Sequence, residues 1–375
     1  MEILENLKDV FELATSATTL IKEITKNKNN KKKLEENNLI KVSRSNYARI
    51  GSSGYYAQIG SSGNSARIGS SGDSAQIGSS GDSAQIGSSG DYAQIGSSGD
   101  SAQIGSSGDS AQIGSSGDSA QIGSSGDYAQ IGSSGDYAQI GSSGYYARIG
   151  SSGYYARIGS SGNYAQIGSS GNSAQIGSSG NYAVISAIGI SSIIKAKKGS
   201  WITLAEYNND NKPICVKSAQ IDGVMLKEDT YYCLYDSEFK EVQVVDNCAT
   251  IIEKQKNNII KGRFLNTKEK CFIFEKNGVF AHGKTARQAY IDWLFKTSDR
   301  NVEQYKNIDK SEVYSLNWWV IAYRTITGAC SMGTNNYLET NKEKYKKEMT
   351  LEDVLEATQG QYGHETFKEF FERNV

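Results

Sequence analysis

The chain has 375 residues, which is room for two or three structural units, and a formal net charge of −1. A net charge this close to zero creates no global basic field, so we expect neither direct binding of nucleic acid nor attraction to an anionic membrane. The five cysteines, an odd number without a C-x-x-C pair, favour reduced thiols over disulfides or a zinc site, and hence a cytoplasmic protein without a metal or cofactor.

The first 27 residues predict an amphipathic helix, because apolar residues such as Leu4, Leu7 and Phe11 recur at helical spacing. Their acidic residues and interrupted apolar stretch are not typical of a signal peptide, and no segment has the roughly 20 apolar residues of a membrane-spanning helix. Two roles remain open for residues 1–45, which end in a basic linker. They either cap the first coil of the next domain or form a coiled coil that joins copies into a homo-oligomer.

Residues 46–195 repeat a nine-residue unit, [S/Y]-A-[Q/R]-I-G-S-S-G-[D/N/Y], in which isoleucine returns at every ninth position from Ile50 to Ile176. Within a unit, alanine and isoleucine stand two positions apart, as in Ala84 and Ile86, so they point to the same side of a strand. The residues beside them point outward. The Gly-Ser-Ser-Gly segment then turns the chain, since glycine admits backbone angles that other residues disfavour.

Nine residues are too few to encircle a core, so two repeats form the smallest coil that can do so, with a triangular coil of three repeats as the alternative. Stacking at roughly 4.8 Å gives about eight coils and a rod of about 38 Å. The predicted fold class is therefore mainly β: a parallel β-solenoid of nine-residue repeats, two per coil, with an N-terminal helix and a C-terminal α+β domain.

The nine-residue period ends near residue 196, and residues 196–375 have the composition of an α+β domain. A division of this domain near residue 256 is an alternative. Strands are expected over 200–207 and 214–221, and a hairpin over Asn277–Gly278. Helices are expected over 286–296, 315–327, 350–358 and 364–373. Thr285 is the expected N-cap of the first helix and Thr350 that of the third.

Eight consecutive repeats carry aspartate at the same corner, where like residues of stacked coils form columns. Regular negative charge on a rod imitates the phosphates of DNA, which makes these residues candidates for binding a protein partner. Four arginines in the repeat reduce the negative excess, and aspartate is also a good turn residue, so a structural role is the competing interpretation. The candidates are Asp73, Asp82, Asp91, Asp100, Asp109, Asp118, Asp127 and Asp136.

Tyrosines gather at both ends of the repeat, and those near its C-terminal end are the second group of candidates for partner binding. Exposed aromatic rows commonly mark binding surfaces, because tyrosine supplies contact area at a low entropy cost. Stacking that stabilises the end coils is the alternative explanation. The candidates are Tyr145, Tyr146, Tyr154, Tyr155 and Tyr164.

Metal binding and catalysis are the less favoured interpretations. Calcium-binding nonapeptides follow the order G-G-x-G-x-D-x-U-x, whereas here aspartate directly follows the second glycine of the corner, so we expect no metal.

In the C-terminal domain, Cys330 in TITGACSMG and His364 in GQYGHETF are weak candidates for a nucleophile and its base, and His282 is the only other histidine. The G-A-C context is typical of a packing cysteine.

The repeat, together with the segments LAEY and KSAQIDG that follow it, resembles a group of uncharacterised bacterial and phage or prophage proteins with a C-terminal globular domain. The segments YRTITGACSMGT and EATQGQYGHETF resemble C-terminal pieces of the same proteins. The resemblance covers most of residues 46–375. It implies a mobile-element context without assigned catalytic residues, and accessory proteins of this kind frequently bind a host factor.

These observations predict a cytoplasmic, non-enzymatic protein that binds a macromolecular partner. Its most concrete form is a phage or prophage inhibitor of a host defence or nucleic-acid enzyme. One alternative is an enzyme with a Cys330–His364 site. Another is an ice- or glycan-binding repeat surface, although the repeat lacks threonine rows and the chain shows no export signal.

Overall fold

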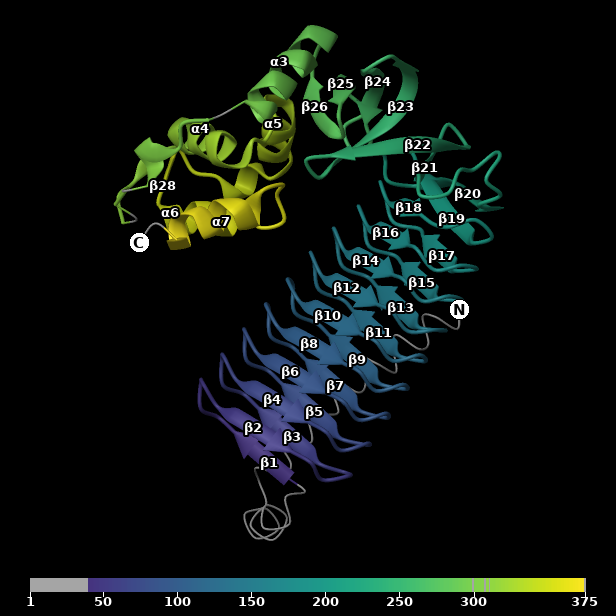
Figure 1. Ribbon diagram of the computed structural model, residues 1–375, viewed down its shortest axis with the longest axis vertical. Coiled ribbons are helices and arrows are strands. Elements are labelled where there is room, and N and C mark those ends of the chain that lie inside the picture. The colour runs from purple at the N-terminus through teal and green to yellow at the C-terminus, as the bar shows by residue number, and fades with distance from the viewer. Residues whose placement is uncertain (1–39, 299, 307, 310, 374–375) are drawn as a thin grey trace. The chain divides into compact units, whose positions relative to one another are not determined.

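The computed structural model describes residues 40–298, 300–306, 308–309 and 311–373 (Figure 1). The helix expected over the first 27 residues, and with it the choice between cap and coiled coil, lies outside the described residues. The chain divides into two compact units, Met1–Phe239 and Lys240–Val375, and each is described by itself.

The first unit is a parallel β-solenoid in which each strand pairs with the strand 18 residues further along, as in Gln121↔Gln139 and Ile122↔Ile140. This register confirms two repeats per coil and excludes the triangular coil of three. The odd-numbered strands form one sheet: β1 (Ile40–Ser43), β3 (Gln58–Ser61), β5 (Gln76–Ser79), β7 (Gln94–Ser97), β9 (Gln112–Ser115), β11 (Gln130–Ser133), β13 (Arg148–Ser151), β15 (Gln166–Ser169) and β17 (Val184–Ala187).

The even-numbered strands form the opposite sheet of the solenoid. They are β2 (Arg49–Ser52), β4 (Arg67–Ser70), β6 (Gln85–Ser88), β8 (Gln103–Ser106), β10 (Gln121–Ser124), β12 (Gln139–Ser142), β14 (Arg157–Ser160), β16 (Gln175–Ser178) and β18 (Ile193–Lys195). The described strands make about nine coils instead of the expected eight or so, because β1 (IKVS) and β18 (IIK) also pair into the two sheets although their sequences depart from the repeat.

The solenoid core consists of alanine and isoleucine, as the repeat predicts. Ala84 is fully buried, and Ile86 is only 4% exposed. The serine that ends each strand also points inward, as Ser79 does, and its Oγ accepts a hydrogen bond from Gly81 N–H at 3.4 Å. Gly81 itself leaves no space for a side chain, since a Cβ there would lie 2.0 Å from the carbonyl oxygen of Gly63 in the coil before it. The corner therefore requires glycine.

Three further strands close the last coil of the first unit, the first parallel to β17 and the other two antiparallel to their partners. The expected strands over 200–207 and 214–221 are confirmed as β19 (Trp201–Tyr207) and β20 (Pro213–Gln220), which extend the odd-numbered sheet. On the even-numbered sheet, β21 (Tyr231–Tyr235) pairs with β18 through Ile194↔Tyr232. These strands belong to the first unit, whereas the sequence pattern groups them with the C-terminal domain.

The second unit contains an antiparallel meander, a two-stranded sheet and five helices among its described residues. The meander comprises β22 (Glu238–Val245), whose first two residues still belong to the first unit, β23 (Cys248–Lys256), β24 (Ile259–Phe264), β25 (Lys270–Lys276) and β26 (Val279–Gly283). The small sheet pairs β27 (Tyr314–Ser315) with β28 (Glu348–Met349). The helices are α3 (Ala286–Thr297), α4 (Leu316–Thr327), α5 (Ser331–Thr340), α6 (Leu351–Ala357) and α7 (His364–Arg373), with 3-10 turns η1 (Glu303–Tyr305) and η2 (Lys342–Lys344).

Local sequence signals correctly located most of these elements. Asn277 and Gly278 both have positive φ and form the hairpin turn between β25 and β26. Thr285 caps α3 by accepting a hydrogen bond from Gln288 N–H at 3.1 Å, and Thr350 caps α6 within a complete capping box. Helix α5 was not expected, because its sequence, SMGTNNYLET, lacks an apolar stripe at helical spacing.

The core of the second unit's helical part is aromatic. Trp319 on α4 is almost fully buried against Phe367 and Phe371 of α7, at ring-centroid distances of 6.3 Å. Trp319 also donates its indole N–H to the carbonyl of Met349 at 2.8 Å. Across the described part of the chain, no helix is both long enough and apolar enough to span a bilayer.

Candidate functional site

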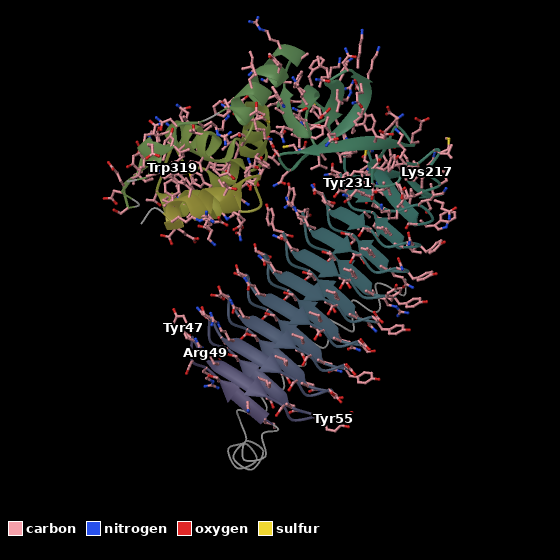
Figure 2. The ribbon with its side chains drawn as sticks, viewed as in Figure 1. Tyr47, Arg49, Tyr55, Lys217, Tyr231 and Trp319 are labelled. Carbon is pink, nitrogen blue, oxygen red and sulfur yellow. The ribbon has the colours of Figure 1, made fainter. Side chains whose placement is uncertain are left out.

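Two corners connect the sheets of the solenoid and carry the predicted site residues. We call the corner after each even-numbered strand the first edge, and the corner after each odd-numbered strand the second edge. Figure 2 shows the two edges on opposite sides of the coil, with Tyr55 on the first and Tyr47 on the second. The aspartates divide into two columns of four: Asp73, Asp91, Asp109 and Asp127 on the first edge, and Asp82, Asp100, Asp118 and Asp136 on the second.

Some aspartates connect successive coils through their side chains. Asp127 Oδ1 accepts a hydrogen bond from Tyr145 N–H at 3.2 Å, and Asp136 Oδ1 accepts one from Tyr154 N–H at 2.7 Å. Asn163 makes the same contact with the next coil, again at 2.7 Å. A neutral amide oxygen therefore performs this structural task as well as a carboxylate does, so the corner does not require the negative charge.

The aspartate columns concentrate negative charge on the two edges. Neighbouring aspartates of a column are one strand spacing apart, about 4.8 Å. Two unit charges at that distance repel each other by about 1 kcal/mol in water, less when salt screens them. None of the ion pairs among the described residues involves an aspartate of either column. The columns are therefore open to a cationic partner.

The tyrosines form a stack on the first edge. The rings of Tyr128, Tyr146, Tyr164 and Tyr182 lie above one another, with successive centroids 5.5, 5.2 and 5.5 Å apart. Their outer faces remain accessible, with Tyr146 46% exposed and Tyr164 44% exposed. The same tyrosine side chains therefore stack on one another and remain accessible to a partner.

The structure separates the predicted tyrosines into two groups. Tyr145, Tyr146 and Tyr164 lie on the first edge, whereas Tyr154 and Tyr155 lie on the second. On the second edge Tyr155 stacks on Tyr137 at 5.2 Å. Tyr128 and Tyr182 also belong to the first-edge stack and were not among the predicted residues, although their 18-residue spacing from Tyr146 and Tyr164 is visible in the sequence.

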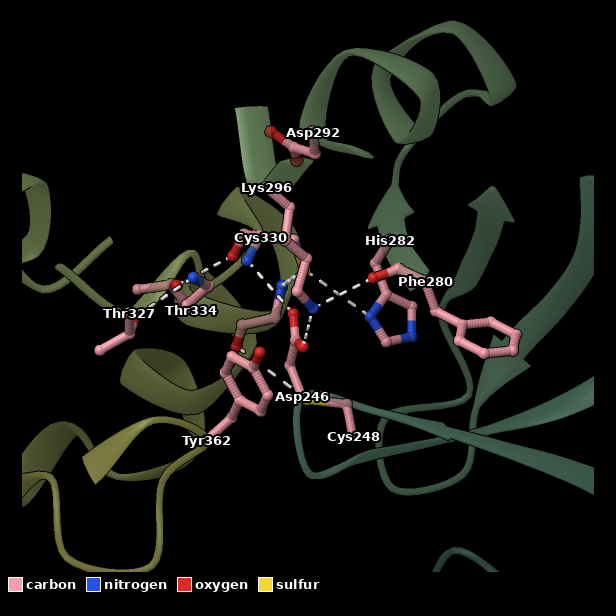
Figure 3. Close-up of polar contacts among 12 residues, drawn as sticks. Asp246, Cys248, Phe280, His282, Asp292, Lys296, Thr327, Cys330, Thr334 and Tyr362 are labelled. Carbon is pink, nitrogen blue, oxygen red and sulfur yellow. Dashed lines mark hydrogen bonds and ion pairs between the residues drawn. The ribbon is translucent and has the colours of Figure 1, made fainter. Parts of the chain in front are cut away.

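The expected pair of Cys330 and His364 is not formed, which corrects that part of the enzyme hypothesis. His364 Nδ1 contacts Thr358 Oγ1 at 3.1 Å. Cys330 instead faces His282, with 3.8 Å between Sγ and Nδ1 (Figure 3). The other imidazole nitrogen, Nε2, lies 3.0 Å from Thr250 Oγ1.

Two buried carboxylates hold the start of α5 and with it Cys330. Asp246 accepts the backbone N–H of Cys330 at 3.2 Å and forms an ion pair with Lys296 (Figure 3). Asp292 accepts the backbone N–H of Ser331 at 3.2 Å. Negative groups at a helix N-terminus are favourable, because unpaired backbone N–H groups point toward them. The cluster thus positions a helix.

The chemistry of this cluster does not favour nucleophilic catalysis. Cys330 and His282 are both fully buried. Burial lowers the pKa of His282 to about 4, with nearby Asp246 opposing the change, and burial raises the pKa of the Cys330 thiol well above its ordinary value. The pair is therefore a neutral thiol beside a neutral imidazole, without the thiolate that attacks a substrate.

Metal binding finds no support at this cluster. Burial raises the pKa of Cys248 to about 12 and that of Cys271 to about 11, so these neighbouring thiols are also protonated at neutral pH. Within the described ranges, no group of three histidine, cysteine, aspartate or glutamate side chains has an arrangement that could hold a metal ion.

Comparison of the chain with models of protein families, with curated proteins and with solved structures finds no match. The corners of the solenoid and the buried cluster must therefore be interpreted from their own chemistry.

Proposed function

We propose that this chain is a non-enzymatic binding protein whose first edge engages a basic, arginine-containing surface of a partner protein. The observation that supports the proposal is that the acidic column and the tyrosine stack follow one another along the same edge. The column Asp73, Asp91, Asp109 and Asp127 leads directly to Tyr145 and the stack of Tyr146, Tyr164 and Tyr182.

Arginine suits both parts of this edge. Its planar guanidinium donates hydrogen bonds to carboxylates and also packs on the faces and edges of aromatic rings. The Asn163 contact supports a role for the charge in recognition, since asparagine performs the same structural task without repulsion between coils. Eight consecutive aspartates therefore favour a function that needs negative charge.

The most concrete form of this proposal is a phage or prophage protein that inhibits a host defence or nucleic-acid enzyme in the cytoplasm. A nucleic-acid enzyme presents a basic face to phosphates, which follow one another about every 3.4 Å along one strand of a duplex. Each aspartate column presents a charge about every 4.8 Å, so it is a sparser mimic of one strand. The neutral, buried Cys330–His282 pair supports the non-enzymatic part of the proposal.

The first experiment identifies the partner and then tests the edge. The intact protein is used as bait in lysate of a bacterial host, with and without nuclease, and enriched proteins are identified by mass spectrometry. The affinity of the purified partner is then measured for D73N/D91N/D109N/D127N and for the matched set D82N/D100N/D118N/D136N on the second edge.

We expect the first-edge variant to lose at least tenfold in affinity, since four charge-assisted contacts are weakened, and the second-edge variant to bind nearly as the wild type does. Both variants lose the same number of charges, so the comparison separates a local contact from a general field effect. Equal losses for the two edges, or no loss for either, would contradict the proposed edge.

A further inference from the structure

The outer face of the even-numbered sheet contains a long groove that the proposed edge does not use. Each even-numbered strand from β2 to β16 points a glutamine or arginine and a glycine outward, and stacking aligns them into two parallel columns. Along the glycine column the floor is open: a Cβ added at Gly87, Gly105 or Gly123 would meet nothing within 4 Å. The groove has a volume of about 1550 Å³, and its lining extends from Arg49 to Tyr231.

Cationic side chains occupy both ends of this groove. Arg49 and Arg67 line the end nearest β2, and Arg157 and Lys195 line the other. Figure 2 shows Arg49 and Tyr231 near opposite ends of the solenoid. Between these ends the wall consists of glutamines: Gln85, Gln103, Gln121 and Gln139.

Two side chains meet beside the glycine column at the end nearest β18. Lys195 Nζ lies 4.8 Å from the ring centroid of Tyr231, and a Cβ at Gly177 would lie 3.7 Å from Lys195 Cε and 3.9 Å from the Tyr231 hydroxyl. The one carboxylate in the groove's described lining, Asp229, forms an ion pair with Lys197 at 2.6 Å. Among the described residues, no ion pair neutralises Arg157 or Lys195.

The geometry of the groove restricts what it can bind. From β2 to β18 it spans eight strand spacings, about 38 Å, a length that suits a linear polymer lying along the solenoid axis. The backbone N–H and C=O groups of the sheet are already paired between strands, so recognition depends on side chains. Glutamine amides both donate and accept hydrogen bonds, which suits a chain rich in hydroxyl groups.

Nucleic acids fit this groove poorly. Proteins that bind single strands stack the bases on successive aromatic side chains, and Tyr231 is the only aromatic residue in the groove's described lining. A duplex carries a phosphate charge about every 1.7 Å, which four cations over about 38 Å do not match. An acidic peptide that adds a strand needs an open sheet edge, and the groove lies on a sheet face.

We propose that this groove binds an anionic polysaccharide, with its acidic groups at Arg157 and Lys195 and at the opposite arginines, and its hydroxyl groups along the glutamine column. The glycine floor lets sugar rings approach the sheet where any larger residue would exclude them. This ligand class is independent of the protein partner proposed for the first edge.

Binding is tested by calorimetry with a size-defined oligogalacturonate as the anionic probe. A neutral cello-oligosaccharide, a thymidine oligonucleotide and a poly-glutamate peptide of similar length serve as comparison ligands. We expect measurable binding of the oligogalacturonate alone. Absence of this binding, or tighter binding of any comparison ligand, overturns the proposal.

Two variants locate the binding in the groove. R157Q/K195Q removes the cations at one end, and G105L/G123L fills the floor at positions where the fold leaves space. Each is expected to weaken oligogalacturonate binding at least tenfold. The control R148Q changes the same repeat position on the odd-numbered sheet, outside the groove, and is expected to bind as the wild type does.

Further controls separate this proposal from the proposed function and from misfolding. The first-edge variant D73N/D91N/D109N/D127N should retain oligogalacturonate binding, since its charges lie outside the groove lining. Far-UV circular dichroism and thermal unfolding establish that each variant is folded. Unchanged binding by folded G105L/G123L, or an equal loss with R148Q, overturns the groove as the site.

Discussion

The serine at the end of each solenoid strand has one environment in the first half of the repeat and another in the second. Ser97 Oγ accepts a hydrogen bond from Gly99 N–H at 3.4 Å. From Ser133 to Ser178 the corresponding Oγ atoms are buried and have no hydrogen-bond partner among the described residues. A buried hydroxyl without a partner costs about 1–3 kcal/mol, so identical residues contribute unequally to stability.

The substitution S151A is expected to stabilise the protein by about 1 kcal/mol, because it removes a buried hydroxyl that has no partner in the described structure. The matched substitution S97A, which removes the bond to Gly99, is expected to destabilise it by about 0.5–1 kcal/mol. Urea unfolding of both variants measures the difference. Equal effects would show that the two serines have the same environment in solution.

The buried His282 predicts a dependence of stability on pH. Its pKa is about 4 in the folded protein and near the ordinary 6.5 in the unfolded chain. The unfolded chain therefore binds the proton first, so the contribution to stability is complete above about pH 6.5 and decreases as the pH falls toward 4. The total loss is about 3 kcal/mol.

NMR titration of the two histidines checks this expectation directly in the native protein. The ring signals of His282 should not change between pH 7 and pH 5. Those of His364, which is half-buried, should begin to change at a higher pH than those of His282 as acid is added. Titration of His282 near pH 6.5 in the folded protein would mean that the imidazole is accessible, and it would reopen the case for a Cys330–His282 active site.

At the scale of elements, each corner column behaves as one electrostatic unit. Like charges one strand spacing apart repel, and salt weakens that repulsion. The tyrosine stack on the same edge acts in the opposite direction, because stacked aromatic pairs contribute about 0.5–1.5 kcal/mol each beyond their buried area. The first edge thus combines a destabilising segment with a stabilising one.

Replacing the first-edge aspartates in D73N/D91N/D109N/D127N is expected to stabilise the solenoid by about 1–3 kcal/mol at low ionic strength, with a smaller gain at 1 M salt. Asparagine keeps the contact between coils that Asp127 makes, since Asn163 makes the same contact. Urea unfolding at two salt concentrations measures the gain. A loss of stability would mean that the carboxylates are required by the corner, and it would remove the argument that their charge serves a partner.

At the scale of the whole molecule, the solenoid is a one-dimensional stack in which each coil contacts only its neighbours. Whole coils can therefore be removed without changing any remaining contact. Removal of half a coil, which is one repeat, has a different effect. Every strand before the deletion then lies in the opposite sheet relative to the strands after it.

Deletion of residues 91–108 removes one coil, and Arg49 and Arg67 stay on the same sheet as Arg157. Deletion of residues 91–99 removes one repeat and moves these two arginines to the opposite sheet. We expect both proteins to fold, as judged by circular dichroism, and only the shorter deletion to lose oligogalacturonate affinity. Equal affinities for the two deletions would show that the opposite arginines do not contribute.

The sequence by itself determined the solenoid and several elements of the second unit, and it left the coil size between two repeats and three until the strand register decided it. Period-two placement of Ala84 and Ile86 defines the strands, and Thr285 and Thr350 mark helix starts, because such signals act between residues close in the chain. The tertiary structure alone decided that Cys330 meets His282 across 48 residues, that α5 forms without an apolar stripe, and that glycines and cationic side chains of different strands line one groove. These features arise from packing between distant segments, which no local pattern in the sequence encodes.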